Sequence, residues 1–293
     1  MKYATTIDEQ INKLQSRGLI IKDRSKAEEI LLDIGYYRFC SYLFPFELSY
    51  PRKRHRLHFY SSNTNLEDGL DLYYFDFDLR RLLLKYLFRI EVNIRTYITY
   101  YVSNHYKSDP CWFISPAIMH AVYVNHFDKT FYIRLKRNNP IIIEHHRNHP
   151  GHHHAPAWKT IEQMPFGNVQ ILFNSIIDAK VRQDISQHYG VSKLKIFDDY
   201  INTIRLIRNN CAHGSVIFDM KLPLPIHNGP AGHFNNFTNS NIIGIIDVIK
   251  FFLKQISIPR YTEFCHELDN LLDRVTNSKV REILKVVSGF NIK

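Results

Sequence analysis

The sequence predicts an all-α protein, and three observations lead to this prediction. Apolar residues recur at spacings of three and four along most of the chain, which is the period of an amphipathic helix. Two segments near the start carry Ser or Thr with Glu three residues later, the capping-box pattern that opens helices. Alternating apolar segments joined by short Gly turns, which would indicate β-hairpins, are not found. The expected architecture is therefore a bundle of helices.

The first helix is expected to follow Thr6, whose hydroxyl is spaced to cap the helix while Glu9 reaches back, and to stop at Gly18. Ser25 and Glu28 repeat the pattern and predict the start of a second helix. Six aromatic residues follow between positions 36 and 46. Their apolar neighbours favour packing in the core over stacking on nucleic-acid bases.

The longest periodic segment runs from about residue 70 to residue 106 and predicts one long amphipathic helix. Further helices are predicted at 116–137, 166–179, 181–189, 193–213, 241–256, 260–275 and 278–288. The Pro- and His-rich residues 138–160 and the Pro-, Gly- and Asn-rich residues 221–241 are predicted as connections. We expect an N-terminal helical segment at 1–60 and a helical domain at 61–293, packed together as one globular unit.

The composition is that of a globular protein with an excess of positive charge. Hydrophobic residues make up 45% and charged residues 23% of the 293, which is ordinary for a soluble protein. The net charge of +10 suits a polyanion, and nucleic acid is the first candidate, without a choice between RNA and DNA. Four widely spaced cysteines fit a reducing compartment. Because Asp247 and Lys250 interrupt the most apolar segment, we expect a cytoplasmic protein without a membrane span.

The sharpest chemical signal is the sequence IRNNCAH, which ends the helix predicted at 193–213. Cleavage of a phosphodiester needs a cation that holds the phosphate and a group that moves a proton near neutral pH. Arg208 supplies a planar fork that matches phosphate oxygens, and His213 titrates in the required range. In RNA the 2′-hydroxyl is an internal nucleophile, so the protein need not supply a covalent nucleophile or a metal.

On a regular helix Arg208 and His213 lie roughly 140° apart, so they share a face only if the helix ends between them. Gly214 favours such an end, and a second copy of the motif from another subunit would help to complete a site. In the alternative interpretation, Arg208 pairs with an acidic neighbour and His213 merely closes the helix. A pattern this short, taken by itself, favours the alternative interpretation, because short motifs match by chance.

Longer blocks resemble the Abi-like (AbiD/AbiF-type) abortive infection family, namely residues 10–47, 75–103, 156–176 and 207–219 in that order. The resemblance implies an HEPN-type helical bundle with extra N- and C-terminal helices, whose R-x4-6-H motif cleaves RNA without a metal or cofactor. Arg208 and His213 would then be the catalytic pair and Asn209 the polar residue after the Arg. Two such motifs usually meet across a dimer, and some members are paired with a small structured RNA. Where many relatives have a second His and a basic residue, this chain has Gly214 and Ser215.

Three further residues fall in blocks that the resemblance covers. Glu91 and Arg95 stand four apart on the long helix, and the resemblance implies that they support the active-site helix. An ion pair within one helix explains them at least as well. Glu162 follows the sequence WKTI and would face the active site, although a carboxylate at a helix start explains it equally well.

Two clusters outside the motif suggest other contacts. Residues 51–58 bring together Arg52, Lys53, Arg54 and Arg56, which suit contact with an RNA backbone because cations bound to phosphate displace counterions. A solvated charged loop is an equally good explanation. The sequence HHRNHPGHHH at 145–154 has irregular spacing and no nearby Cys, which favours a polar loop with weak metal affinity over a zinc site.

The leading functional hypothesis is a metal-independent endoribonuclease that acts as a homodimer, in phage defence or as a toxin. The alternative is an RNA-binding protein that holds a structured small RNA with little or no cleavage. A purely structural bundle is disfavoured by the charge of +10 and the intact motif.

Overall fold

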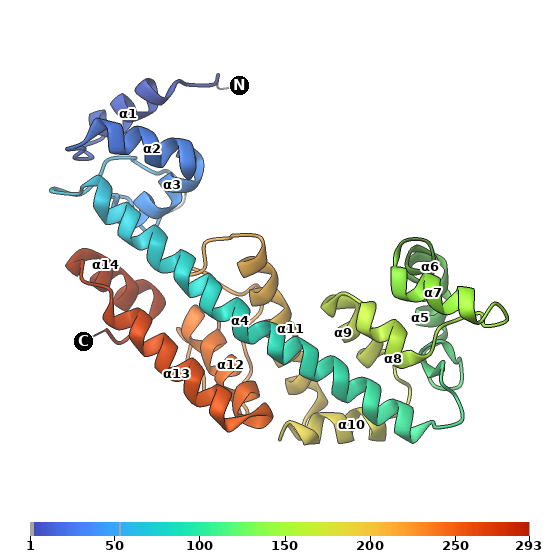
Figure 1. Ribbon diagram of the computed structural model, residues 1–293. Coiled ribbons are helices and arrows are strands. Elements are labelled where there is room, and N and C mark those ends of the chain that lie inside the picture. Colours follow the sequence, from blue (N-terminus) through green and yellow to red (C-terminus); the bar gives the residue numbers. More distant parts are fainter. Residues whose placement is uncertain (1–2, 53, 293) are drawn as a thin grey trace. The chain divides into compact units, whose positions relative to one another are not determined.

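The structure is a computed structural model that describes residues 3–52 and 54–292 (Figure 1). Within these ranges all regular secondary structure is helical, and strand-like pairing is limited to isolated bridges such as that of Ile20 with Asn65. The predicted all-α class is confirmed. In the same ranges, no helix has both the length and the apolar character needed to cross a membrane.

The chain forms two compact units. Unit 1 comprises residues 1–82, 211–220 and 266–293, and unit 2 comprises residues 83–210 and 221–265. Three of the four boundaries fall within the helices α4 (Leu66–His105), α11 (Leu194–Ala212) and α13 (Ile258–Asp273), and the fourth lies between residues 220 and 221, outside any helix. The division expected at residue 60 stays a prediction.

Unit 1 begins with α1 (Ile7–Ser16) and α2 (Arg24–Asp33). The capping box at the start of α1 is confirmed, because the Thr6 hydroxyl accepts from the Glu9 amide and the Glu9 carboxylate accepts from the Thr6 amide. The cap predicted at Ser25 is wrong. Asp23 caps α2 instead and accepts from the Lys26 amide, which suits a helix N-terminus because it places a negative charge there.

The aromatic run of unit 1 forms α3 (Tyr36–Leu43) and the short helix η1 (Phe44–Phe46). Phe39, Tyr42, Phe44 and Phe46 are buried, so these side chains pack in the core as predicted, whereas Tyr37 is 90% exposed. The unit is completed by α14 (Ser278–Ile283) and η5 (Leu284–Ser288), which follow α13 along the chain.

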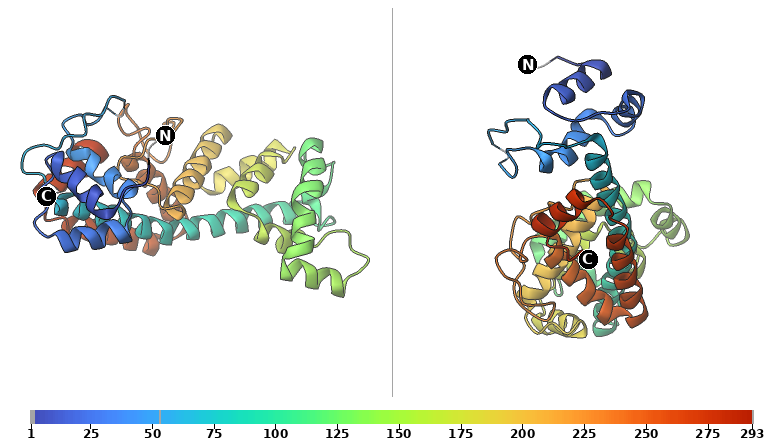
Figure 2. Two further views of the ribbon diagram at one scale, coloured as in Figure 1. Left: turned by 90° about the horizontal axis from the view of Figure 1, so that it is seen from above. Right: turned by 90° about the vertical axis from the view of Figure 1, so that its left-hand side faces the viewer.

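The long helix predicted at about 70–106 is confirmed as α4, which begins four residues earlier and which the left view of Figure 2 shows lengthwise. In unit 2 its apolar positions Ile90, Ile94 and Ile98 are fully buried. The Tyr86 ring meets the Phe264 ring of α13 edge to face, with centroids 5.0 Å apart. Unit 2 is therefore built around the second half of α4.

The middle of the chain differs most from the prediction. One helix was expected at 116–137, but α5 (Ala121–His126) begins five residues later and continues through the π-helical η3 (Phe127–Tyr132) into α6 (Ile133–Asn138). Residues 138–160 were expected to be a connection, yet they contain α7 (Pro140–Asn148) and α8 (Ala157–Thr160). The start of α7 has a clear cause: Asn139 caps it by accepting from two amides, and Pro140 occupies its first position.

Three of the remaining helices of unit 2, α9 (Phe166–Asn174), α10 (Ala179–His188) and α12 (Ile242–Ile256), lie close to their predicted ranges. The short helices η2 (Trp112–Ile114) and η4 (Ile161–Gln163) were not predicted. The rings of Tyr189, Phe197 and Phe252 meet one another and join α10, α11 and α12 in one core. Residues 221–241 contain no helix, as predicted.

Candidate active site

The C-terminal half of α11 carries the motif predicted to be catalytic. Ile201, Ile204 and Ile207 are buried and fix the face that α11 turns to the core of unit 2. Arg208 follows directly and is half-buried, with 29% of its side chain exposed. The helix ends at Ala212, between Arg208 and His213, and Gly214 has a left-handed backbone with φ of 67°. The helix end that the sequence predicted before His213 is therefore present.

Arg208 is held in unit 2 by three neighbours. Its Nε lies 3.2 Å from Oε2 of Glu91, and its Nη1 donates to Oδ1 of Asn209 over the same distance. Its guanidinium carbon lies 5.5 Å from the centre of the Phe88 ring, within the range of a cation–π contact. The acidic partner that the alternative interpretation required is thus present, and it is Glu91.

Glu91 joins Arg208 to a second arginine. The Arg95 guanidinium donates to Oε1 of Glu91 over 2.8 Å and to the backbone carbonyl of Met164 over 2.9 Å. Another nitrogen of Arg95 lies 3.9 Å from Oε1 of Glu162, which belongs to η4. Arg208, Asn209, Glu91, Arg95 and Glu162 therefore form one cluster, which we call the Arg208 cluster.

The Arg208 cluster contains an unusual concentration of unsatisfied polar atoms. The side chains of Glu91 and Arg95 are 8% and 9% exposed. Oε2 of Glu91, Nε of Arg95 and Nε of Arg208 are buried and make no hydrogen bond within the described part of the chain. Glu91 and Arg208 thus face each other at ion-pair distance without the alignment of a hydrogen bond. Buried atoms of this kind are rare in folded proteins and are a feature of sites that bind or react.

His213 belongs to unit 1, where it follows the end of α11 and is exposed. No described residue bonds to its imidazole. The segment directly after it is well anchored: Arg38 donates to the carbonyl of Gly214 over 2.8 Å, and Arg80 donates to the carbonyl of Ser215 over 3.1 Å. The backbone next to His213 is therefore fixed in unit 1 while its ring stays accessible.

A buried carboxylate that the sequence analysis missed holds the same segment. Asp76 of α4 is fully buried and accepts from the backbone amides of Ile217 and Phe218, from the Tyr42 hydroxyl and from the Arg80 guanidinium. Burial raises the pKa of Asp76, and Arg80 and the other donors oppose that rise. Asp76 thus ties α3, α4 and residues 217–218 together in unit 1.

The basic residues predicted to contact RNA differ from one another in their surroundings. Arg52 and Arg54 are exposed, and Lys53 lies outside the described residues. Arg56 forms an ion pair with the buried Glu47, whose carboxylate accepts from the Arg56 Nε over 3.1 Å. The guanidinium carbon of Arg56 lies 4.2 Å from the centre of the Phe44 ring. Its charge is therefore already compensated within unit 1.

The His-rich segment folds into the end of α7 and the loop before α8. No group of three His, Cys, Asp or Glu in the described residues is arranged to hold a metal ion. His145 is buried, and burial lowers its pKa, with Lys159 and neighbouring histidines acting in the same direction. These residues line a pocket that is separate from the residues of the Arg208 cluster.

Comparison with known proteins assigns the chain to a family. The profile of the Abi-like protein family matches residues 29–219, about two thirds of the chain. The chain belongs to the Abi-like protein family. The match includes every member of the Arg208 cluster as well as His213, and it ends at Asp219, directly after the segment that Asp76 anchors. Membership suggests a role in abortive infection.

No curated protein and no solved structure is similar enough to this Abi-like chain to extend the comparison.

Proposed function

We propose that this Abi-like protein is a metal-independent endoribonuclease of the HEPN type, with Arg208 and His213 as the catalytic pair. The observation that carries the proposal is the Arg208 cluster. In this cluster the half-buried guanidinium of Arg208 lies among buried polar atoms that make no hydrogen bond within the described part of the chain. The exposed His213 follows five residues later, directly after the end of the same helix. The family match across both residues supports the same assignment.

The proposed chemistry uses the substrate's own nucleophile. His213 takes the proton from the RNA 2′-hydroxyl, and the 2′-oxygen attacks the adjacent phosphorus. The bond from phosphorus to the 5′-oxygen breaks, and that oxygen leaves with a proton from a general acid. The products are a 2′,3′-cyclic phosphate and a 5′-hydroxyl.

Arg208 stabilises the negative charge that develops on the phosphate oxygens. Its Nε lies at ion-pair distance from Glu91 and its Nη1 donates to Asn209, so Nη2 is the nitrogen that neither neighbour engages among the described residues. One edge of the planar guanidinium is held by protein groups, so the other edge can donate to phosphate. Because the side chain is already ordered, this contact costs little further side-chain entropy.

The proposal also includes the setting of the reaction. A homodimer brings two motifs together, so that one histidine serves as base and a group of the second motif as acid. RNA is the substrate, and a small structured RNA is a candidate regulator. The cytoplasm is the expected location, and halting host growth during phage infection, or action as a toxin, is the expected role.

The test is expression of the wild type and His213→Ala in bacteria, with growth followed while RNA ends are sequenced. We expect the wild type to stop growth and to produce new RNA ends with 5′-hydroxyls, and the variant to do neither. The purified wild type should cut RNA equally well in EDTA. Intact RNA with both proteins, even after removal of any co-encoded RNA, contradicts cleavage.

A second candidate function follows from the charge balance of the Arg208 cluster. Two arginines face two carboxylates there, so the cluster itself is close to neutral. Such a cluster suits a structural or RNA-holding role with little or no cleavage. In that case loss of Arg208 weakens RNA binding and does not change a cleavage rate, and RNA affinity falls steeply with salt.

Glu91→Gln should lower the cleavage rate about 10- to 100-fold without weakening RNA affinity. Gln keeps the shape of Glu91 but removes the charge that orients Arg208, and a small displacement of a catalytic group has effects of this size. Single-turnover cleavage and equilibrium RNA binding, measured on the same preparations, separate the two quantities.

Glu263→Gln is the matched control, because Glu263 of α13 pairs with Lys85 on the surface of unit 2, where both side chains are about half exposed. We expect it to cleave at the wild-type rate. Equal rates for Glu91→Gln and the wild type would remove Glu91 from the positioning of Arg208.

A further inference from the structure

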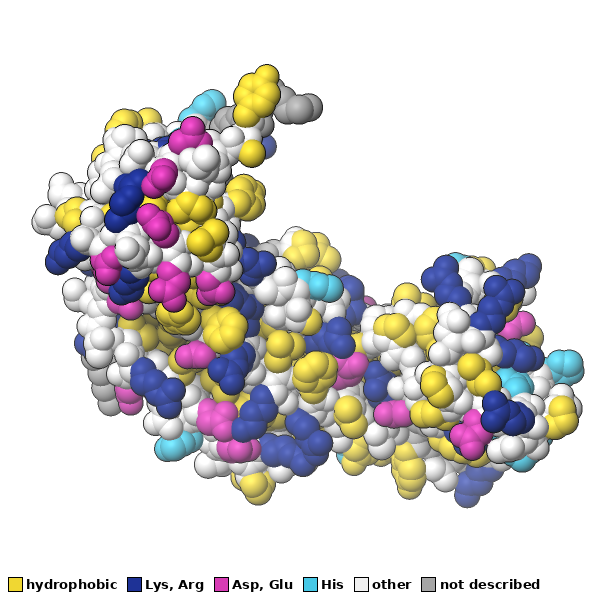
Figure 3. Space-filling view, turned by 45° about the horizontal axis from the view of Figure 1, so that its top comes forward, with side chains coloured by type: hydrophobic (Ala, Val, Ile, Leu, Met, Phe, Trp, Pro, Cys, Tyr) yellow, Lys and Arg dark blue, Asp and Glu magenta, His cyan; other side chains and the backbone are white. Residues whose placement is uncertain are grey.

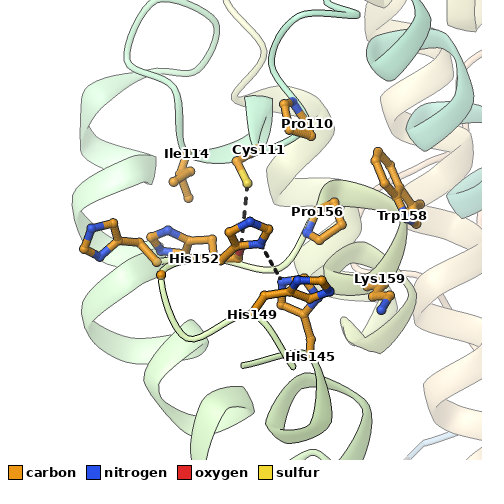
Figure 4. Close-up of a pocket in the computed structure, with 12 residues that line it drawn as sticks. Pro110, Cys111, Ile114, His145, His149, His152, Pro156, Trp158 and Lys159 are labelled. Carbon is orange, nitrogen blue, oxygen red and sulfur yellow. Dashed lines mark hydrogen bonds between the residues drawn. The ribbon is translucent and has the colours of Figure 1, made fainter. Parts of the chain in front are cut away.

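A pocket of about 660 Å³ lies in unit 2, in the size range of small-molecule sites. Its lining comes from the chain before η2, the end of α7, the loop after it and α8. Figure 4 shows the rings of His145, His149 and His152 on one side, with Trp158 and Lys159 on another and Pro110 and Cys111 above. The walls are thus aromatic and apolar, with hydrogen-bonding groups at a few points.

The polar side chains of the pocket are mainly histidines, with one lysine. Five of the twelve lining residues are histidines, one is Lys159, and none is acidic. Nδ1 of His152 lies 3.3 Å from Nε2 of His145, and the His149 and His152 rings stack 4.9 Å apart. His145 is 4% exposed, and its Nδ1 has no partner in the described residues. A lining of this kind suits a ligand that is flat and negatively charged.

Trp158 is the feature that points to a ring. Its side chain is 56% exposed, whereas Trp112, the other tryptophan of the chain, is fully buried. Because indole has a large apolar surface, an exposed tryptophan beside a pocket is a typical stacking platform. Lys159 follows directly and forms no ion pair with any described residue, so its ammonium remains available to a phosphate.

The surroundings of the pocket strengthen the preference for an anion. Residues 121–160 contain six Lys or Arg but two acidic residues. Figure 3 shows Lys and Arg side chains gathered over the end of unit 2 formed by α5–α7, with histidines among them. One of the two acids, Asp128, is already engaged by Nε2 of His154 at 2.6 Å.

We propose that this pocket binds a nucleotide, with the base stacked on Trp158 and the phosphate held by Lys159 and the histidines. The same chemistry belongs to a free nucleotide and to a nucleotide unit within single-stranded RNA. The inference does not depend on cleavage at Arg208, since it concerns binding at a separate set of residues.

Trp158 itself provides the readout. Tryptophan fluorescence of the full chain is titrated with adenosine 5′-monophosphate, adenosine, inorganic phosphate and a short single-stranded RNA. We expect saturable quenching by the monophosphate, with adenosine and phosphate each bound at least about tenfold more weakly. If the monophosphate binds as tightly as the RNA, the ligand is a free nucleotide. If the RNA binds tightly and the monophosphate binds weakly, the ligand is a nucleotide unit within RNA.

Three variants, assayed by calorimetry, test the assigned roles. Trp158→Ala should weaken binding of the tighter ligand about tenfold, while Trp158→Phe restores most of it. Lys159→Gln should weaken the binding of the monophosphate but not the binding of adenosine, which has no phosphate. Lys180→Gln, which removes a surface lysine paired with Asp184, is the control and should bind as the wild type does.

The proposal is overturned if neither the monophosphate nor the RNA binds saturably. It is also overturned if the Trp158→Ala and Lys159→Gln variants bind the monophosphate and the RNA with the affinity of the wild type. It is also overturned if Zn²⁺ alone changes the fluorescence while no nucleotide does, since the pocket is then a metal site. Because Trp158 is exposed, its variants should fold normally, and thermal unfolding of each checks this.

Discussion

Purified His213→Ala should cleave RNA about 100- to 10,000-fold more slowly than the wild type, while RNA affinity stays within about twofold. Proton transfer by a positioned histidine contributes rate factors of this size. The imidazole is exposed and has no partner among the described residues, so its loss should disturb neither unit 1 nor RNA contacts elsewhere. Single-turnover cleavage of a labelled RNA, with binding measured in parallel, gives both numbers.

His233→Ala is the control for this experiment, since His233 is also exposed and lies in the loop after α11. It should cleave at the wild-type rate. Arg208→Lys adds a second comparison: it keeps the charge but loses the planar fork, so it should remain well below the wild-type rate. A His213→Ala protein that cleaves as fast as the wild type would remove His213 from the mechanism.

Asp76→Asn should lower the free energy of unfolding by about 3–5 kcal/mol. Asn keeps the shape of Asp76 but not its charge, which leaves the Arg80 guanidinium, with 6% of its side chain exposed, without a buried counter-charge. It also weakens the acceptor for the amides of Ile217 and Phe218. Urea unfolding followed by circular dichroism measures the change.

Asp78→Asn is the matched control, two residues further along the same helix. Asp78 pairs with Arg81 across 3.6 Å, and their side chains are 46% and 71% exposed. Exposed pairs contribute little, so this variant should lose at most about 1 kcal/mol. Similar losses in both variants would mean that the buried network of Asp76 does not stabilise unit 1.

Most of the helices could be predicted from periodicity, because their apolar faces are repeated often enough to be recognised. The long helix α4 is the clearest case, with Ile90, Ile94 and Ile98 at regular spacing. The helix α7 escaped prediction because its nine residues include three histidines or arginines in the last turn, and its composition therefore resembles a loop. The signals at Asn139 and Pro140 were present but were outweighed by that composition.

The candidate site was predictable only in part. Arg208, Glu91, Arg95 and Glu162 were found through a motif and a resemblance, yet their mutual contacts depend on how α4, α11 and η4 meet, which no local pattern contains. Asp76 was missed because a carboxylate on a charged stretch of helix gives no sign that two of its partners, the amides of Ile217 and Phe218, lie more than 140 residues away. For the same reason, the pairing of Arg56 with Glu47 was not foreseen.

Unit 1 is assembled from three separate stretches of sequence, and this has a consequence for biosynthesis. When Asp76 leaves the ribosome, the amides that it will bind are not yet made, and the Ser288 hydroxyl that donates to the carbonyl of Phe218 is made later still. Units fold during synthesis only once their parts are present. The anchoring of the segment after His213 is therefore complete only after residue 288 has been made. Chains interrupted between residues 221 and 265 carry the motif but lack the third stretch of unit 1, which completes the support around the segment after His213.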